Sequence, residues 1–108
     1  MQKSKAEITQ QNKQKYLISG TVDFSTVPDL LRKASGFISA SNAAENKPVM
    51  IDLSQVNDCN SAALALMLEV VKTAGQKNIE LYFENLPVTV STIAKAYGVE
   101  KEIREYCR

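Results

Sequence analysis

The feature that most constrains the fold is an alternation of short strand-like segments with longer helix-like segments. Residues 49–53 are apolar except for Asp52, and residues 79–84 alternate apolar with polar side chains, which are two patterns of β-strands. Between them, from Ala62 onward, apolar residues recur at intervals of three and four, as on one face of a helix. A strand, a helix and a second strand in this order predict a right-handed crossover between parallel strands, and therefore an α/β domain.

Two further strands are predicted before that unit. Residues 6–10 alternate apolar with polar side chains, and residues 15–22 are rich in β-forming residues interrupted by Gly20. The polar residues 11–14 between them fit a hairpin turn. We expect this hairpin to add an antiparallel edge to an otherwise parallel sheet.

Each predicted helix is marked by residues that begin or end helices. Thr26, followed by Asp29, approximates a capping box, and Pro28 suits a first turn. The second helix begins near Ala62 and ends at Gly75, in the position of a left-handed cap. The core-facing residues of the first helix are Val27, Leu30, Leu31, Ala34 and Ile38, and those of the second are Leu64, Met67, Leu68 and Val71. A third helix is predicted from Pro87 to Gly98, with Leu86, Val90, Ile93 and Tyr97 buried. A surface loop is predicted over residues 41–47 and a short terminal helix within residues 99–108.

These elements predict one domain spanning residues 1–108 with the order ββαβαβα(α). The fold class is α/β, with a mixed, mostly parallel four-stranded sheet flanked by helices. Because residues 49–53 show no alternation, we expect both faces of the sheet to be covered there. Sites in such sheets form where strand carboxyl ends meet helix amino ends, here at the turn after Val22 and at residues 57–61.

Composition and charge disfavour several classes of function. The 108 residues include 13 Lys and Arg against 12 Asp and Glu, so a net charge of +1 provides no excess of cations for a nucleic acid. The chain contains no histidine, which removes the imidazole base of a catalytic triad and an imidazole metal ligand. Two cysteines, Cys59 and Cys107, cannot form a four-thiolate zinc site, and their separation in a chain without a secretory signal argues against a disulfide. We expect no cofactor.

The apolar runs predict a cytoplasmic protein. Residues 1–12 contain no apolar stretch of the length found in signal peptides. The longest apolar run, residues 62–68, is about a third of the roughly 20 residues that a membrane-spanning helix needs. We therefore expect no direct insertion into a membrane.

Few side chains remain that could carry chemistry. Cys59 precedes a predicted helix, where a thiol can be a nucleophile, but a phosphatase of that design needs an arginine about six positions later, and Ala65 stands there. Asp52 and Asp58 have no third ligand for a metal ion. We predict a buried structural thiol at Cys59, and neither a catalytic nor a metal site.

The start of the second predicted helix is more informative. Ser61 suits a helix N-cap, and a hydroxyl at an exposed helix start also favours a phosphate, because the helix dipole and free N–H groups stabilise the dianion. Ala62, Ala63 and Ala65 leave the first turn almost without side-chain bulk, which lets another protein approach closely. Asp23 is more typical of a turn or helix cap than of a site. Ser61 and the three alanines therefore predict a docking surface at the start of this helix.

The order of elements and three motifs together resemble the STAS domain, the fold of the anti-sigma factor antagonists. The motifs are Ser-Gly-Thr-Val-Asp at residues 19–23, Val-Met-Ile-Asp-Leu-Ser at residues 49–54 and Asn-Ser-Ala-Ala-Leu at residues 60–64. The resemblance covers nearly the whole chain and implies the STAS fold.

The resemblance also implies roles for individual residues. Ser61 falls on the position that a partner kinase phosphorylates in sporulation and stress antagonists, and Asp23 on an acidic position that helps form their partner-binding surface. Two residues depart from the family pattern: Asn60 replaces the usual acid before the serine, and Ala63 replaces a glycine. Loss of the acid implies a docking role without phosphorylation.

Within the family, the C-terminal half is similar to the small STAS subunit of the Mla phospholipid transporter, through residues 64–68 and 93–99. In that group the domain binds the cytoplasmic ATPase of an inner-membrane ABC transporter. The leading hypothesis is a non-catalytic cytoplasmic subunit, peripheral to the inner membrane through the transporter, that docks through Asp23, Asn60, Ser61, Ala62, Ala63 and Ala65. The alternative hypothesis is an anti-sigma factor antagonist that a serine kinase switches by phosphorylating Ser61.

Overall fold

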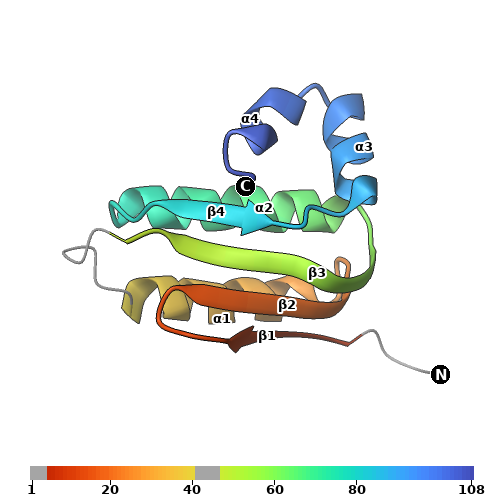
Figure 1. Cartoon of the computed structure of the whole chain (residues 1–108). Coiled ribbons are helices and arrows are strands. Elements are labelled where there is room, and N and C mark those ends of the chain that lie inside the picture. The colour runs from red at the N-terminus through yellow and green to blue at the C-terminus, as the bar shows by residue number, and fades with distance from the viewer. Residues whose placement is uncertain (1–4, 41–46) are drawn as a thin grey trace.

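The computed structural model describes residues 5–40 and 47–108. Its element order is that predicted from the sequence (Figure 1). The predicted surface loop lies outside the described residues except for Lys47, which is exposed. The elements are β1 Ala6–Gln10, β2 Lys15–Val22, α1 Val27–Ala40, β3 Val49–Cys59, α2 Ser61–Gln76, β4 Leu81–Glu84, α3 Val88–Ala96 and α4 Glu100–Arg104.

The four strands form one sheet in the order β1-β2-β3-β4. β1 and β2 pair antiparallel through the predicted hairpin, with Ile8 opposite Ile18. β2 pairs with β3, and β3 with β4, in parallel. The prediction of a mostly parallel sheet with an antiparallel edge is therefore confirmed.

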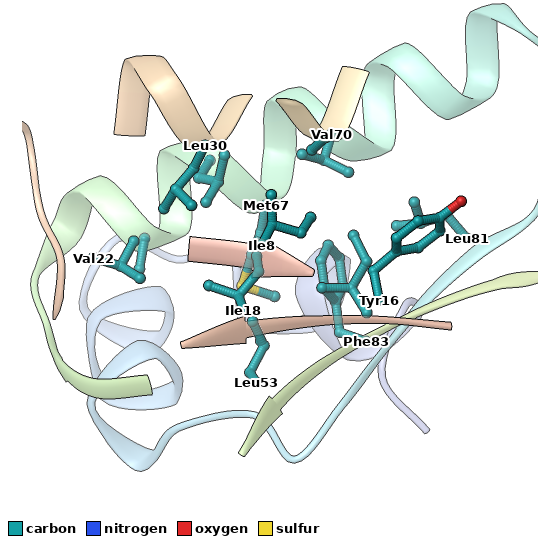
Figure 2. Close-up of a cluster of buried hydrophobic side chains, with 14 of the residues drawn as sticks. Ile8, Tyr16, Ile18, Val22, Leu30, Leu53, Met67, Val70, Leu81 and Phe83 are labelled. Atoms are coloured by element: carbon teal, nitrogen blue, oxygen red, sulfur yellow. The ribbon is translucent and has the colours of Figure 1, made fainter. Parts of the chain in front are cut away.

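The hydrophobic core lies between the sheet and the two long helices, α1 and α2, which run behind the strands in Figure 1. Burying one valine, leucine, isoleucine, phenylalanine or methionine side chain stabilises a fold by about 1.5–3 kcal/mol. This layer therefore supplies the main driving force of folding. Figure 2 shows the strand and helix side chains in contact, among them Tyr16, Ile18, Val22, Leu30, Met67, Val70 and Phe83.

The prediction that both sheet faces are covered at residues 49–53 is wrong. Burial alternates there: Val49, Ile51 and Leu53 are buried, whereas Met50 and Asp52 are half-exposed on the opposite face. The reason is topological. The strands follow one another in sequence order across the sheet, so both right-handed crossovers place their helices, α1 and α2, on the same face.

The predicted faces and ends of two helices need correction. In α2, Leu68 is 39% exposed instead of buried, and the sheet-facing positions include Leu66 and Val70. The buried face of α2 could not be identified from its sequence, because the helix is apolar on nearly all sides. Gly75 does not end α2, which continues to Gln76, and the residue with positive φ is Asn78.

Gly98, with φ of 74°, does follow the end of α3 as predicted. Tyr97, expected in the core, is 65% exposed. It lies after the last turn of α3, where the buried side chains are Val90 and Ala94. None of the helices within residues 5–40 and 47–108 has the combined length and apolar character that a membrane crossing requires.

Gly20 provides a test of the β1–β2–β3 junction. Its φ is 94°, and a Cβ atom there would lie 2.3 Å from the carbonyl oxygen of Lys5, which accepts the N–H of Thr21. We expect Gly20→Ala to lower the free energy of unfolding by about 2 kcal/mol or more in urea denaturation. The matched control is Gly36→Ala in α1, where a Cβ meets nothing within 4 Å. It should stabilise the protein by about 0.5–1 kcal/mol, and equal effects of the two changes would contradict this account.

Candidate functional site

The carboxyl ends of β2 and β3 meet the amino ends of α1 and α2 at one corner of the molecule. Val22 pairs with Cys59 at the end of the parallel ladder, and the N–H of Asn60 donates to the carbonyl of Val22 at 3.3 Å. The turn after β2 and the start of α2 are therefore adjacent, as predicted. We call this region, defined by Asp23, Phe24, Asn60, Ser61 and Ala65, the docking corner.

The turn before α2 is shorter than predicted, because β3 continues through Asn57 and Asp58 to Cys59. Only Asn60 separates strand from helix, and its side-chain oxygen accepts the N–H of Ala62 at 2.9 Å. The prediction that Ser61 caps α2 is wrong, since Asn60 is the N-cap and Ser61 is the first helical residue. The Ser61 hydroxyl, half-buried, has no hydrogen-bond partner within residues 5–40 and 47–108.

The prediction of an exposed alanine surface is wrong for two of its three residues. Ala62 and Ala63 are buried, and Ala63 packs in the core cluster. Their small size lets the first turn of α2 lie close to the chain's own interior, so neither side chain is available to a partner. Ala65 is exposed as predicted.

The accessible face of α2 begins at Ser61 and runs along the helix. Ser61, Ala65, Leu68 and Lys72 are four, three and four residues apart, which places them on one stripe of an α-helix. Ser61 is half-buried and the other three are exposed, Leu68 to 39%. We call these four residues the α2 stripe.

Asp23 organises the turn between β2 and α1. Its carboxylate accepts the N–H of Ser25 at 2.9 Å, the hydroxyl of Ser25 at 2.6 Å and the N–H of Thr26 at 3.1 Å. The buried Thr26 hydroxyl accepts the N–H of Asp23 and donates to the carbonyl of Thr21 at 2.9 Å, instead of forming the predicted capping box with Asp29. These bonds make a turn of defined shape beside Asn60.

Phe24 is the residue at this corner that sequence reasoning missed. Its side chain is 69% exposed although it is large and apolar, and it projects from the turn that Asp23 and Thr26 hold. Exposed aromatic side chains are enriched among the residues that dominate protein–protein binding. Its exposure could have been predicted from its position, because Phe24 stands between Asp23 and Ser25 in a polar turn and belongs to no periodic apolar pattern.

Cys59, the candidate nucleophile of the sequence, ends β3 beside this corner. Cys59 is half-buried, and desolvation together with the nearby charge of Asp58 raises the pKa of its thiol above 9.0, which disfavours the reactive thiolate. In the part of the chain that the structure describes, no three cysteine, aspartate or glutamate side chains gather to hold a metal ion.

Asp52 is a structural residue of the open sheet face. Burial by itself would raise its pKa, but hydrogen bonds from the Asn85 amide at 2.9 Å and the Ser54 N–H at 2.8 Å, with the charge of Lys15, outweigh that effect and lower the pKa below 3.8. Asp52 therefore joins β3 to the turn after β4. Asp58, which the sequence analysis placed in a turn, lies in β3.

The cap assignment predicts contrasting effects of two neighbouring substitutions. Asn60→Ala should lower the free energy of unfolding by about 1 kcal/mol, because the N–H of Ala62 loses its acceptor. Ser61→Ala should change it by less than about 0.5 kcal/mol, since no cap is lost. Urea denaturation of both variants measures the difference, and a larger loss for Ser61→Ala would show that the serine is the cap.

Comparison with known protein families finds one match. The sequence model described as "Mlab, STAS domain" matches residues 9–105. No curated protein sequence matches the chain.

Solved structures share the fold. One chain of the Acinetobacter MlaFEDB complex in an ATP-bound conformation is 24% identical, with a TM-score of 0.70 over 83% of this chain and 90% of that one. Phosphorylated SpoIIAA from Bacillus is 13% identical, with a TM-score of 0.68 over 96% of this chain and 89% of that one. An anti-sigma factor antagonist from Mycobacterium paratuberculosis is 18% identical, with a TM-score of 0.66 over 93% and 82%.

Proposed function

Because this chain belongs to the STAS domain family, we propose that it is a non-catalytic subunit that binds and regulates the cytoplasmic ATPase of an Mla-type phospholipid ABC transporter. The observation that carries the proposal is the match of residues 9–105 to the Mlab branch of the family. The shared fold with a chain of the Acinetobacter MlaFEDB complex supports it. Such a subunit is cytoplasmic and reaches the inner membrane only through the transporter.

The contact surface in this proposal is the docking corner together with the α2 stripe. Asn60 and Ala65 are exposed, and the Ser61 hydroxyl, which bonds to none of the described residues, can bond to a partner. Asp23 contributes by shaping the turn that presents Phe24. Ala62 and Ala63 belong to the core beneath this surface and are not part of the contact.

Phe24 is the anchor of the proposed contact. A rigid turn presents its ring to solvent, so little conformational entropy is lost when a partner pocket receives it. Leu68, further along the α2 stripe, extends the apolar area. Regulation follows if the ATPase offers the pocket in only one of its conformations, because binding then favours that conformation by the difference in affinity.

Co-purification tests the proposed contact. Ser61→Glu and Phe24→Ala should each reduce retention of the ATPase by more than about tenfold, the first by placing a desolvated charge in the contact and the second by removing the anchor. The melting temperature should stay nearly unchanged, since a carboxylate suits the first turn of a helix and Phe24 is exposed.

The matched controls lie at the other ends of two helices. Ser39, exposed near the end of α1, and Tyr97, 65% exposed after the last turn of α3, receive the changes Ser39→Glu and Tyr97→Ala. Both controls should retain the ATPase. Full retention by Ser61→Glu and Phe24→Ala would refute the proposed surface.

One observation favours a second function, that of an anti-sigma factor antagonist switched at Ser61. The serine begins α2 with a hydroxyl that no described residue engages, and the positive end of the helix dipole stabilises a phosphate there. Incubation with ATP and candidate serine kinases, followed by intact-mass measurement, distinguishes the two functions. The transporter proposal predicts no added phosphate, whereas phosphorylation that Ser61→Ala abolishes would favour the switch.

A further inference from the structure

The outer edge of β4 is occupied by residues 106–108. Cys107 forms a parallel bridge with Phe83, in which the N–H of Phe83 donates to the carbonyl of Tyr106 at 2.6 Å and the N–H of Arg108 donates to the carbonyl of Phe83 at 2.8 Å. The N–H and the carbonyl of Phe83 at the outer edge of β4 are therefore both hydrogen-bonded to residues 106–108. In Figure 1 the chain after α4 turns back onto this edge.

Side chains add a charge-specific contact to these backbone bonds. The guanidinium carbon of Arg108 lies 3.6 Å from the centre of the Tyr82 ring, in the geometry of a cation–π interaction. Glu80 and Glu84 flank Tyr82 on the same face of the sheet. The Glu80 carboxylate is 3.5 Å from the Tyr82 hydroxyl, whereas the Glu84 carboxylate is paired with Lys15 at 3.4 Å. This face of β4 is suited to a cation.

The occupying segment is short and lies at the border of the core. Among the described residues, one isolated bridge with two backbone hydrogen bonds joins it to the sheet, and the half-buried side chains of Tyr106 and Cys107 pack against the edge of the core. The buried Ile103 of α4 fixes the residues before it. Partly exposed segments at the end of a chain open more easily than central strands.

We propose that the β4 edge is a strand-addition site for an extended segment of a partner that carries a basic side chain opposite Tyr82, and that residues 106–108 close this site until they are displaced. An unpaired strand edge supplies backbone donors and acceptors, and the neighbouring side chains supply specificity. Residues 106–108 show the chemistry that the site selects, because their own arginine stacks on the ring of Tyr82. This site is independent of the docking corner and of the proposed transporter function.

Alkylation of Cys107 in the full chain, divided for each protein by the rate of the same chain unfolded in urea, measures opening of the segment. The division is needed because the charge of Arg108 also lowers the pKa of the Cys107 thiol. Arg108→Ala removes the cation–π contact and keeps the backbone N–H, so the rate should rise roughly two- to fivefold. Arg108→Pro removes both that contact and the N–H that bonds to Phe83, so the rate should rise roughly tenfold or more. Cys59, half-buried at the end of β3, is the internal control and should react at one rate in all three proteins. Equal Cys107 rates in the three proteins would overturn the proposal.

The partner's chemistry is tested on the isotope-labelled Arg108→Pro chain with an acetylated peptide, Arg-Glu-Tyr-Ser-Arg, which repeats residues 104–108 with serine for cysteine. At millimolar concentration the peptide should shift the amide signals of Leu81–Glu84, and a control peptide ending in glutamate should not. Absence of these shifts, or an equal response to both peptides, would overturn the proposal. Shifts of the same amides that depend on protein concentration alone would show that a second copy fills the edge, and would equally overturn it.

Discussion

The parallel pairing of β2 with β3 is the interaction on which the rest of the structure depends. It joins segments separated by the whole of α1 and aligns them through Val22 opposite Cys59. That register places the first residues of α1 and α2 at the same end of the sheet. Asp23 can then shape the turn before α1 through Ser25 and Thr26, and Asn60 the neighbouring start of α2 through Ala62 and the carbonyl of Val22.

A second constraint comes from the sequential strand order. Because both right-handed crossovers place α1 and α2 on one face, the opposite face keeps a partly exposed layer of polar and mixed side chains, including Lys15, Asp52 and Glu84. Lys15 and Glu84 form an ion pair of 3.4 Å across β3. Both groups are about one-third exposed, so the pair contributes at most about 1 kcal/mol to stability and serves to align the edge strand.

The two proposed interaction surfaces follow from where the sheet ends. The docking corner lies at the carboxyl ends of β2 and β3, where short turns present Phe24 and Ser61. The second surface is the lateral edge of β4, a strand of only four residues that pairs with the beginning of β3. A partner at one surface and a strand at the other would therefore contact different elements.

The order of the elements and the mostly parallel sheet can be predicted from the sequence, because periodicity and turn residues such as Gly98 act through neighbours along the chain. The same signals predict that the turn after β2 and the start of α2 lie at carboxyl ends of strands. The buried face of α2 cannot be predicted in this way, because its residues are apolar nearly all round, and Ala62 and Ala63 prove to be buried. The exposure of Phe24 and the return of residues 106–108 to β4 are likewise set by the folded arrangement, because burial and edge pairing depend on contacts between residues far apart along the chain.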